Sequence, residues 1–335
     1  MGTTDLVASA IPFLGPVRLV SSADIRFDYR AWNDEAILAA LRAAGWTGGP
    51  IGYFSSYREK YTRTETLLAI LRRNGIKVEE HLFPRRPLAL LRAVWKLSHR
   101  YPVLVLGFRS HGILPLVRLL VGKRSRIVFD AFVSLYDTLC EDRRLLSPDS
   151  LLGKRIKAYD TWLCNLAGAV LVDTKAHAEY FRTTLRSANV FPMYVECNDA
   201  LFTQTTISQS SNIILWYGTC VPLHGVERIL QWAKSLESIS SVRFRLIGPV
   251  AQYYKKLIGE LRLSNVEYVP WVDYERLPQE IASASLCLGG PFGTSDKAQR
   301  VIAGKTYQML ACGANVLVSD TPGNRELFGP VPITT

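Results

Sequence analysis

The sequence lacks the features that mark several special classes of protein. Its six cysteines lie more than 20 residues apart and none forms a C-x-x-C pair, which argues against a zinc site and a secreted disulfide framework. No uninterrupted apolar run approaches the ~20 residues that a membrane-spanning helix needs. The N-terminus, MGTTDLVASAIPFLGP, carries an acid where a signal peptide carries basic residues. We therefore expect a cytoplasmic protein with reduced thiols.

Acidic residues are absent from one long stretch of a chain whose net charge is +11. Residues 81–129 contain no Asp or Glu but ten basic residues: Arg85, Arg86, Arg92, Lys96, Arg100, Arg109, Arg118, Lys123, Arg124 and Arg126. The segment LALLRAVWKLSHR within it is amphipathic, which is typical of a helix lying on an anionic membrane surface. A nucleic-acid surface and ordinary solvated charges are the alternatives. Because no recognition motif accompanies the charges, we expect no nucleic-acid partner.

Strand and helix patterns alternate through both halves of the chain. Apolar strands at helix-length intervals indicate parallel sheets with helices on both faces. The polar segment 198–212 interrupts the alternation and reads as a linker. The sequence thus predicts an α/β protein with two doubly wound Rossmann-like domains, residues 1–200 and 201–335, and a cleft between them. The expected strands are 17–22, 50–56, 77–83, 102–108, 126–132, 169–174, 188–195, 212–218, 242–248, 266–271, 285–290 and 314–320.

The segment WYGTCVPLHGVERIL, residues 216–230, joins a strand to a helix through a small-residue loop. Glycines at Gly218 and Gly225 let backbone N–H groups approach an anion, and the helix N-terminus adds about half a positive charge. Thr219 and His224 stand in the same loop, and His224 could donate a proton or a charge to a phosphate. An ordinary strand-to-helix turn is the alternative interpretation.

A second candidate segment is RVIAGKTYQMLACGANVLVSD, residues 300–320. Arg300, Lys305 and Gln308 are spaced so that one end of a helix aims several donors into the cleft. Tyr307 and Gln308 are candidates for contact with a ribose or a base. An amphipathic helix with a solvated basic face is the alternative.

A third candidate segment follows the strand IVFD. Asp130 lies among apolar residues, and a buried carboxylate without a partner is costly, so it needs a partner or a function. Ser134, Asp137 and Arg143 come after it, on the side of the fold where ligands bind. A structural, hydrogen-bonded role for Asp130 is the alternative.

These segments together resemble the retaining glycosyltransferases of family 4, which have the GT-B fold of two Rossmann-like domains. The resemblance covers both halves and depends on the order of the segments WYGTCVPLHGVERIL, FRLIG, VEYVPWVDYERLPQEIASASLCLG and KTYQMLACGANVLVSDTPGNRELF, with IVFDAFVSLYDT and AVLVDTKAHAEYF upstream. It implies transfer of a sugar from a nucleotide-sugar donor to an acceptor hydroxyl, with retention. The resemblance also implies that the C-terminal domain binds the donor.

The resemblance assigns roles to the donor-side residues. The loop with Gly218 and Gly225 would bind the diphosphate. Many members of the family have an Arg and a Lys there; this chain has Thr219 and His224, so Arg300 and Lys305 would supply the permanent charge. The family also has two Glu residues eight apart, which are Arg300 and Gln308 here. Gln308 can still bond ribose hydroxyls, because an amide both donates and accepts.

On the acceptor side a His often follows the strand that reads RIVFD here, and Asp130 takes its place. We expect Asp130 to contact the sugar or the acceptor hydroxyl. The implied mechanism needs no metal and no cofactor: the helix dipole and basic side chains stabilise the departing nucleoside diphosphate, whose phosphate oxygen acts as the base.

The acceptor would be a saccharide or a lipid-linked acceptor, in lipid-linked or cell-surface polysaccharide synthesis at the inner face of the membrane. The usual final helix of the fold is missing, so we expect a shortened C-terminal end. The alternatives are a catalytically weak relative that acts as a binding or scaffold partner, and an epimerase or phosphorylase of the same fold.

Overall fold

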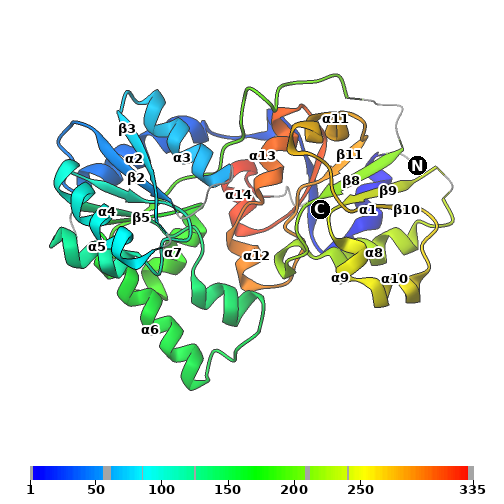
Figure 1. Ribbon diagram of the computed structural model, residues 1–335. Coiled ribbons are helices and arrows are strands. Elements are labelled where there is room, and N and C mark those ends of the chain that lie inside the picture. Colours follow the sequence, from blue (N-terminus) through cyan, green and yellow to red (C-terminus); the bar gives the residue numbers. More distant parts are fainter. Residues whose placement is uncertain are drawn as a thin grey trace. The chain divides into compact units, whose positions relative to one another are not determined.

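The chain folds as two compact units in the computed structural model. Unit 1 combines Met1–Phe27 with Cys197–Thr335, and unit 2 is Asp28–Glu196. Within the described residues, each unit contains one six-stranded sheet with helices packed against it (Figure 1). This arrangement confirms the predicted α/β class with two parallel-sheet units. The structure describes residues 3–55, 62–84, 86–123, 126–207, 212–239 and 241–330.

The sheet of unit 2 has the strand order β3-β2-β4-β5-β6-β7, and every strand pair is parallel. Because side chains alternate along a strand, the two faces of this sheet carry different cores. Leu104 and Leu106 pack with α4, α5 and α6, whereas Val103 and Val105 pack with α2 and α3. The elements are α2 (Tyr29–Ala43), β2 (Ile51–Ser55), α3 (Thr62–Arg73), β3 (Val78–Leu82), α4 (Pro87–Arg100), β4 (Leu104–Leu106), α5 (Leu114–Val121), β5 (Ile127–Asp130), α6 (Leu151–Leu166), β6 (Ala169–Val172), α7 (Lys175–Thr183) and β7 (Val190–Pro192).

The sheet of unit 1 has the strand order β1-β12-β11-β8-β9-β10, in which only the β1–β12 pair is antiparallel among the described strands. Strand β8 is an interior strand of this sheet, between β11 and β9, and the loop that contains Gly218 and Gly225 follows it. The elements are α1 (Thr3–Leu14), β1 (Val17–Val20), β8 (Ile213–Tyr217), α8 (Val226–Ser235), β9 (Arg243–Ile247), α9 (Val250–Tyr253), α10 (Lys255–Leu261), β10 (Val266–Val269), α11 (Leu277–Ala282), β11 (Leu286–Leu288), α12 (Asp296–Arg300), α13 (Gly304–Ala311), β12 (Val316–Ser319) and α14 (Pro322–Phe328).

The N-terminal 27 residues belong to unit 1, although the sequence analysis placed them in the first domain. The strand at 17–22 was predicted correctly, but it pairs with β12, where Val17 lies opposite Ser319. The apolar face of α1 packs on α8, and the Trp232 indole N–H donates to Ser9 Oγ at 3.0 Å. Arg228 Nε donates to the Phe13 carbonyl at 2.5 Å. These contacts bury the inner side of α1, and the pairing of β1 covers the edge of the sheet that β12 would otherwise expose.

Helix α2 is capped by Asp28. Its carboxylate accepts from the backbone N–H groups of Arg30 and Ala31, both at 3.0 Å. Asn33, in the first turns of α2, is fully buried. Its amide accepts from Tyr194 N at 2.7 Å and donates to the Tyr194 carbonyl at 3.0 Å.

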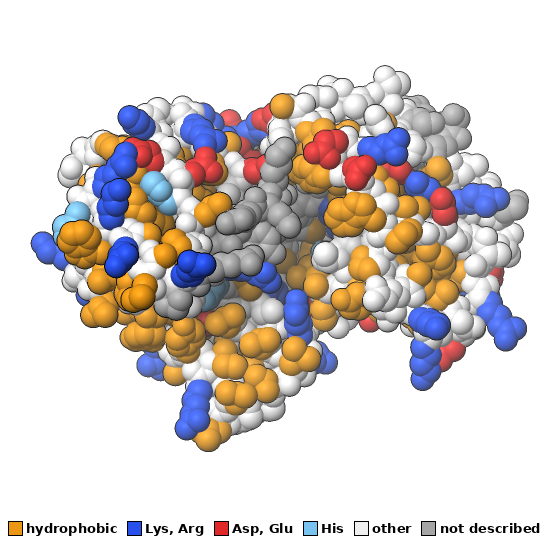
Figure 2. All heavy atoms as spheres, viewed as in Figure 1, with side chains coloured by type: hydrophobic (Ala, Val, Ile, Leu, Met, Phe, Trp, Pro, Cys, Tyr) orange, Lys and Arg blue, Asp and Glu red, His pale blue; other side chains and the backbone are white. Residues whose placement is uncertain are grey.

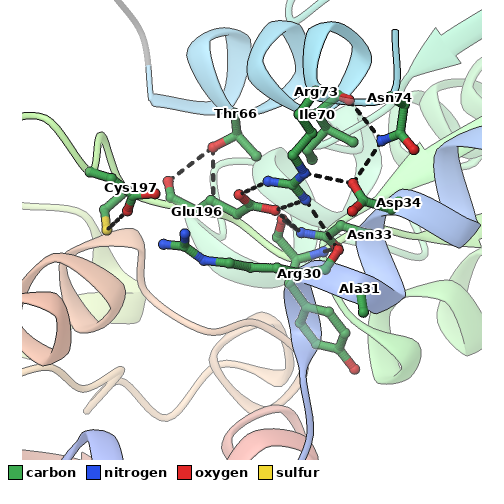
Figure 3. Close-up of polar contacts among 12 residues, drawn as sticks. Arg30, Ala31, Asn33, Asp34, Thr66, Ile70, Arg73, Asn74, Glu196 and Cys197 are labelled. Atoms are coloured by element: carbon green, nitrogen blue, oxygen red, sulfur yellow. Dashed lines mark hydrogen bonds and ion pairs between the residues drawn. The ribbon is translucent and has the colours of Figure 1, made fainter.

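A polar network holds the point where the chain leaves unit 2 (Figure 3). Arg73 donates to both carboxylate oxygens of Glu196, at 2.6 and 2.8 Å, and to Asp34 at 2.6 Å. Asn33 also donates to Glu196, at 2.8 Å. Because Glu196 is buried, these donors compensate for the loss of its hydration. The network fixes the last residue of unit 2 to α2 and α3.

In the part of the chain that the structure describes, no helix is both long enough and apolar enough to cross a membrane.

Candidate functional site

The loop between β8 and α8 is shaped by two glycines with left-handed backbone angles. Gly225 has φ 62° and begins α8, and a Cβ there would lie 2.5 Å from the backbone of Phe292, so only glycine fits. Gly218 has φ 148°. A Cβ on Gly218 would lie 3.4 Å from the His224 ring and 3.7 Å from the Lys305 ammonium. The structure therefore brings Gly218, His224 and Lys305 together, as the sequence predicted.

His224 is a neutral donor to its own loop. Its Nδ1 lies 2.6 Å from the Thr219 carbonyl oxygen, which can only accept, so Nδ1 carries the proton and Nε2 is left as an acceptor. Burial, and then the nearby Lys305 ammonium, lower the pKa of His224 to about 3. In the free protein His224 therefore carries no positive charge near pH 7, and the permanent charge must come from elsewhere.

Lys305, in the first turn of α13, carries a positive charge beside this loop when its ammonium group is protonated. Its side chain is only 7% exposed, and its Nζ donates to the Tyr217 carbonyl at 3.3 Å and lies 4.4 Å from the centre of the Trp216 ring. Burial lowers the pKa of Lys305 to about 7. An anion placed beside Gly218 would stabilise the protonated form, because an opposite charge favours ionisation. The arrangement is suited to bind a phosphate.

Gln308 lies one turn further along α13, between two tyrosines. Its Oε1 accepts from the Tyr217 hydroxyl at 2.9 Å, and its Nε2 donates to the Tyr274 hydroxyl at 3.1 Å. These bonds hold the amide in one orientation. The ring of Tyr307 is only 2% exposed and packs in the interior, and its predicted contact with a ribose or a base stays a prediction.

The positions of the two remaining donor-side candidates give less support to their predicted roles. Thr219 is exposed in the loop, where its carbonyl holds His224. Arg300 is half-buried at the end of α12, and its backbone packs against Gly323. Neither position contradicts the predicted role, and neither adds a geometric argument for it.

Asp130 forms a fully buried ion pair in unit 2. Its side chain is 0% exposed and that of Arg63 is 1% exposed, with 2.9 Å between Arg63 Nη2 and Asp130 Oδ1. Arg63 also donates to the Met193 carbonyl at 2.5 Å and to the Val172 carbonyl at 3.3 Å. Burial raises the pKa of Asp130, and the Arg63 guanidinium opposes that rise. The geometry favours the structural alternative for Asp130, which ties α3 to the carboxyl ends of β5, β6 and β7.

Two other acceptor-side candidates are buried as well. Ser134 Oγ donates to Asp160 Oδ2 at 2.7 Å, and that oxygen also accepts from Tyr136 N at 2.8 Å. Asp137 is fully buried in a short π-helix, 4.0 Å from Nε2 of His177. The segment after β5 is therefore held by the Asp160 carboxylate of α6 and packs against α7, and serves as framework.

Arg143 alone among the predicted acceptor-side residues is exposed. It is thus the only one of the four that is accessible to a ligand in the structure as described.

Sequence reasoning missed the partners of these groups. Arg63 has a signal that was available, because it lies among the apolar positions of the pattern TRTETLLAILRR, where a charge needs a counter-ion. Asp160 carries the same signal inside the apolar face of α6. Tyr274, which holds Gln308, has no local signal, since only the fold brings it to α13.

Among the described residues, no group of three or more His, Cys, Asp or Glu side chains is placed to hold a metal ion.

Comparison with known families gives a match in this part of the chain. Residues 225–331 match the family described as Glycosyl transferase-like. The matched range begins at the Gly225 turn, includes Lys305 and Gln308, and runs through α14. Gly218 and His224 lie directly ahead of it. No curated protein matches the chain in sequence.

Solved glycosyltransferases share the fold of most of the chain. Sucrose-phosphate synthase from Thermosynechococcus elongatus is 15% identical over 83% of each chain, with a TM-score of 0.54. An alpha-glucosyltransferase, solved with UDP and a 13-mer DNA, is 12% identical over 79% of this chain and 78% of that one, also with a TM-score of 0.54. The glycosyl transferase-like domain and a second parallel-sheet unit together give the chain the GT-B fold. The predicted resemblance is confirmed to this extent.

Proposed function

We propose that the protein is a nucleotide-sugar-dependent glycosyltransferase that acts with retention at the anomeric carbon, as the resemblance to family 4 implies. The observation that carries the proposal is the convergence of Gly218, His224 and Lys305 at the N-terminus of α8. A helix N-terminus and a buried ammonium group beside flexible glycine backbone are suited to a diphosphate. The glycosyl transferase-like domain supports glycosyl transfer as the chemistry.

In the proposed reaction the bond between the anomeric carbon and the diphosphate breaks, and negative charge develops on the departing phosphate oxygen. Lys305 and the backbone N–H groups at the start of α8 stabilise that charge. The acceptor hydroxyl forms the new bond on the same face of the sugar, and its proton passes to the departing oxygen. Gln308 orients the nucleoside through its fixed amide. No metal ion or cofactor is required by this scheme.

The acceptor is proposed to be a saccharide or a lipid-linked saccharide, in the synthesis of a lipid-linked or cell-surface polysaccharide. The basic, apolar stretch at 81–129 supports a cytoplasmic protein held peripherally at the inner face of the membrane. Arg85 and Arg124 of that stretch lie outside the described residues. Arg143 is the residue we propose to contact an anionic group of the acceptor.

A catalytically weak binding partner is the second candidate function. Both polar atoms of Gln308 are engaged by tyrosines, so a ribose would have to share or displace these bonds. That observation favours loss of donor affinity relative to a Glu at the same place. An epimerase or phosphorylase of the same fold would be recognised by product formation without an acceptor.

A thermal-shift panel of UDP, GDP, ADP, CDP and TDP tests the proposal. A ligand at 100 times its dissociation constant stabilises the fold by about 2.7 kcal/mol. Stabilisation by one nucleotide, lost in Lys305→Ala, is the expected result; release of the sugar with its original anomeric configuration would then establish retention. No response from a folded sample would overturn the donor site and favour the binding partner.

A further inference from the structure

Unit 2 has an exposed apolar surface that extends beyond the basic stretch at 81–129. Large hydrophobic side chains are exposed on three neighbouring helices. On α4, Leu88 is 72% and Trp95 is 59% exposed, and on α5 Leu119 is 77% exposed. On α6, Leu151 is 68% exposed, with Leu152 and Trp162 also exposed.

The three helices belong to one layer. The inner sides of α4, α5 and α6 all contribute to the core on one face of the sheet, through residues such as Val94, Val117 and Leu163. Their outer sides therefore form one surface, which we call the α4–α6 face. Figure 2 shows hydrophobic side chains gathered over this part of unit 2, with lysines and arginines among them.

The outer side of α6 carries apolar and basic residues together. Leu151, Arg155, Ala158 and Trp162 recur at intervals of three or four on one helix face, and all are exposed. The inner positions, such as Leu163 and Cys164, are buried. Helix α6 thus has large apolar side chains on its outer side in addition to those in the core. The fold buries only the inner side of the helix and leaves these outer apolar side chains exposed to solvent. An exposed apolar patch of this kind indicates a surface that binds another molecule or a membrane.

The charges on the α4–α6 face are almost all positive. Residues 86–123 contain no Asp or Glu, and in α6 the described acid Asp160 is buried. Asp149 is exposed just before α6 and is the exception in residues 143–166. Exposed basic residues lie beside the leucines, namely Arg92, Lys96, Lys123, Lys154 and Arg155.

This combination selects one partner. Lysine is depleted from protein–protein interfaces, whereas lysines and arginines around leucines and tryptophans are typical of helices that lie in the surface of an anionic bilayer. Tryptophan has an apolar ring and one N–H donor, which suits the boundary between head groups and acyl chains. We infer that the α4–α6 face docks on an anionic membrane, with leucines of α4 and α6 inserted between the head groups.

The inference deepens the proposed function, because it names the surface that holds a transferase at its lipid-linked acceptor, and it rests on the proposed function for that purpose only. It adds α6 to the basic stretch and makes the contact partly hydrophobic. A contact made by charge alone would disappear at high salt, whereas inserted leucines are not screened.

Vesicle flotation with the full chain tests the inference. The vesicles are phosphatidylcholine alone or phosphatidylcholine with phosphatidylglycerol, each at low and high salt. The wild type is expected to float with the anionic vesicles and to retain part of that binding at high salt. The variant L151S/L152S is expected to lose about tenfold or more in affinity, since burial of even one of the two leucines is worth more than a tenfold change. Trp271→Ala, which removes an exposed tryptophan of unit 1, is the matched control.

The outcomes separate the possible partners. Wild-type affinity in L151S/L152S would remove α6 from the contact and overturn the inference. Absence of vesicle binding, together with a concentration-dependent dimer that L151S/L152S abolishes, would overturn it in favour of a protein partner. Nucleotide stabilisation in the thermal-shift panel should be unchanged in L151S/L152S. Failure of the membrane inference is thus distinguishable from failure of the donor site.

Discussion

Replacing Lys305 by methionine should stabilise the free protein and at the same time weaken its affinity for nucleoside diphosphates. Methionine has a similar length and no charge. The structure buries the Lys305 ammonium over the Trp216 ring, with one hydrogen bond to the Tyr217 carbonyl. In the free protein, a buried ammonium group lowers the free energy of unfolding. When an anion is bound, the same charge increases the affinity for that anion.

The magnitude follows from the pKa. Burial lowers the pKa of Lys305 from 10.5 to about 7. Each tenfold change in a proton's dissociation constant is worth about 1.4 kcal/mol, so below pH 7 the buried charge lowers the free energy of unfolding by about 5 kcal/mol. Above pH 7 the folded protein has lost this proton, whereas the unfolded chain keeps it up to about pH 10.5. The cost therefore shrinks as the pH rises through this window.

Urea denaturation followed by tryptophan fluorescence measures the effect at about pH 6 and about pH 9. The stabilisation of Lys305→Met relative to wild type should be larger at the lower pH by about 3 kcal/mol. Effects that do not depend on pH, such as the lost hydrogen bond to Tyr217, cancel in this comparison. Lys256→Met removes a fully exposed charge and is the control for the substitution itself.

Calorimetric titration with the nucleoside diphosphate that the panel selects supplies the second half of the prediction. Lys305→Met should bind about tenfold or more weakly at pH 6, since a charge-assisted hydrogen bond is worth about 1.5–3 kcal/mol. Identical pH dependence of stability in the wild type and the variant would refute the buried charge. Unchanged affinity would refute its role at the phosphate.

Substitutions at three further positions test other parts of the two units. Asp130→Asn should lower the free energy of unfolding by about 3–5 kcal/mol, because it leaves the buried Arg63 charge unpaired; a loss below about 1 kcal/mol in urea would contradict the ion pair. His224→Ala should leave nucleoside-diphosphate affinity nearly unchanged at about pH 5 and about pH 6, because the ring, with its pKa of about 3, is neutral at both and uses its one N–H on the Thr219 carbonyl, with none left for a phosphate oxygen. A loss that grows toward pH 5 in the titration would show a charged imidazole. Gln308→Leu should cost about 1–3 kcal/mol by leaving the Tyr217 hydroxyl without its acceptor, whereas Gln308→Glu, which keeps an acceptor, should cost less; equal losses in urea would argue against this bond.

Much of the fold and part of the donor site could be predicted from the sequence. The alternation of apolar strands and helices established two parallel sheets, because a strand buried on both faces must be apolar along its length. The glycines at 218 and 225 marked the loop, since a backbone that approaches an anion needs residues without a Cβ. Lys305 was found because its spacing with Arg300 and Gln308 places several donors at one end of a helix, and the resemblance to family 4 assigned it to the diphosphate. These patterns involve residues that are close together in the chain, so they can be recognised before the fold is known.

What the sequence did not determine depends on contacts between distant segments. The pairing of Val17 with Ser319 moved the N-terminal strand into unit 1, and no local pattern states which sheet a lone strand joins. Asp130 was recognised as a costly carboxylate, but its partner Arg63 comes from a different helix, so a framework ion pair could not be told from a ligand contact. Burial, too, is a property of the assembled unit. It made Tyr307 interior, His224 neutral and Lys305 a group that titrates near pH 7, because the pKa of a side chain is set by the atoms that replace its water.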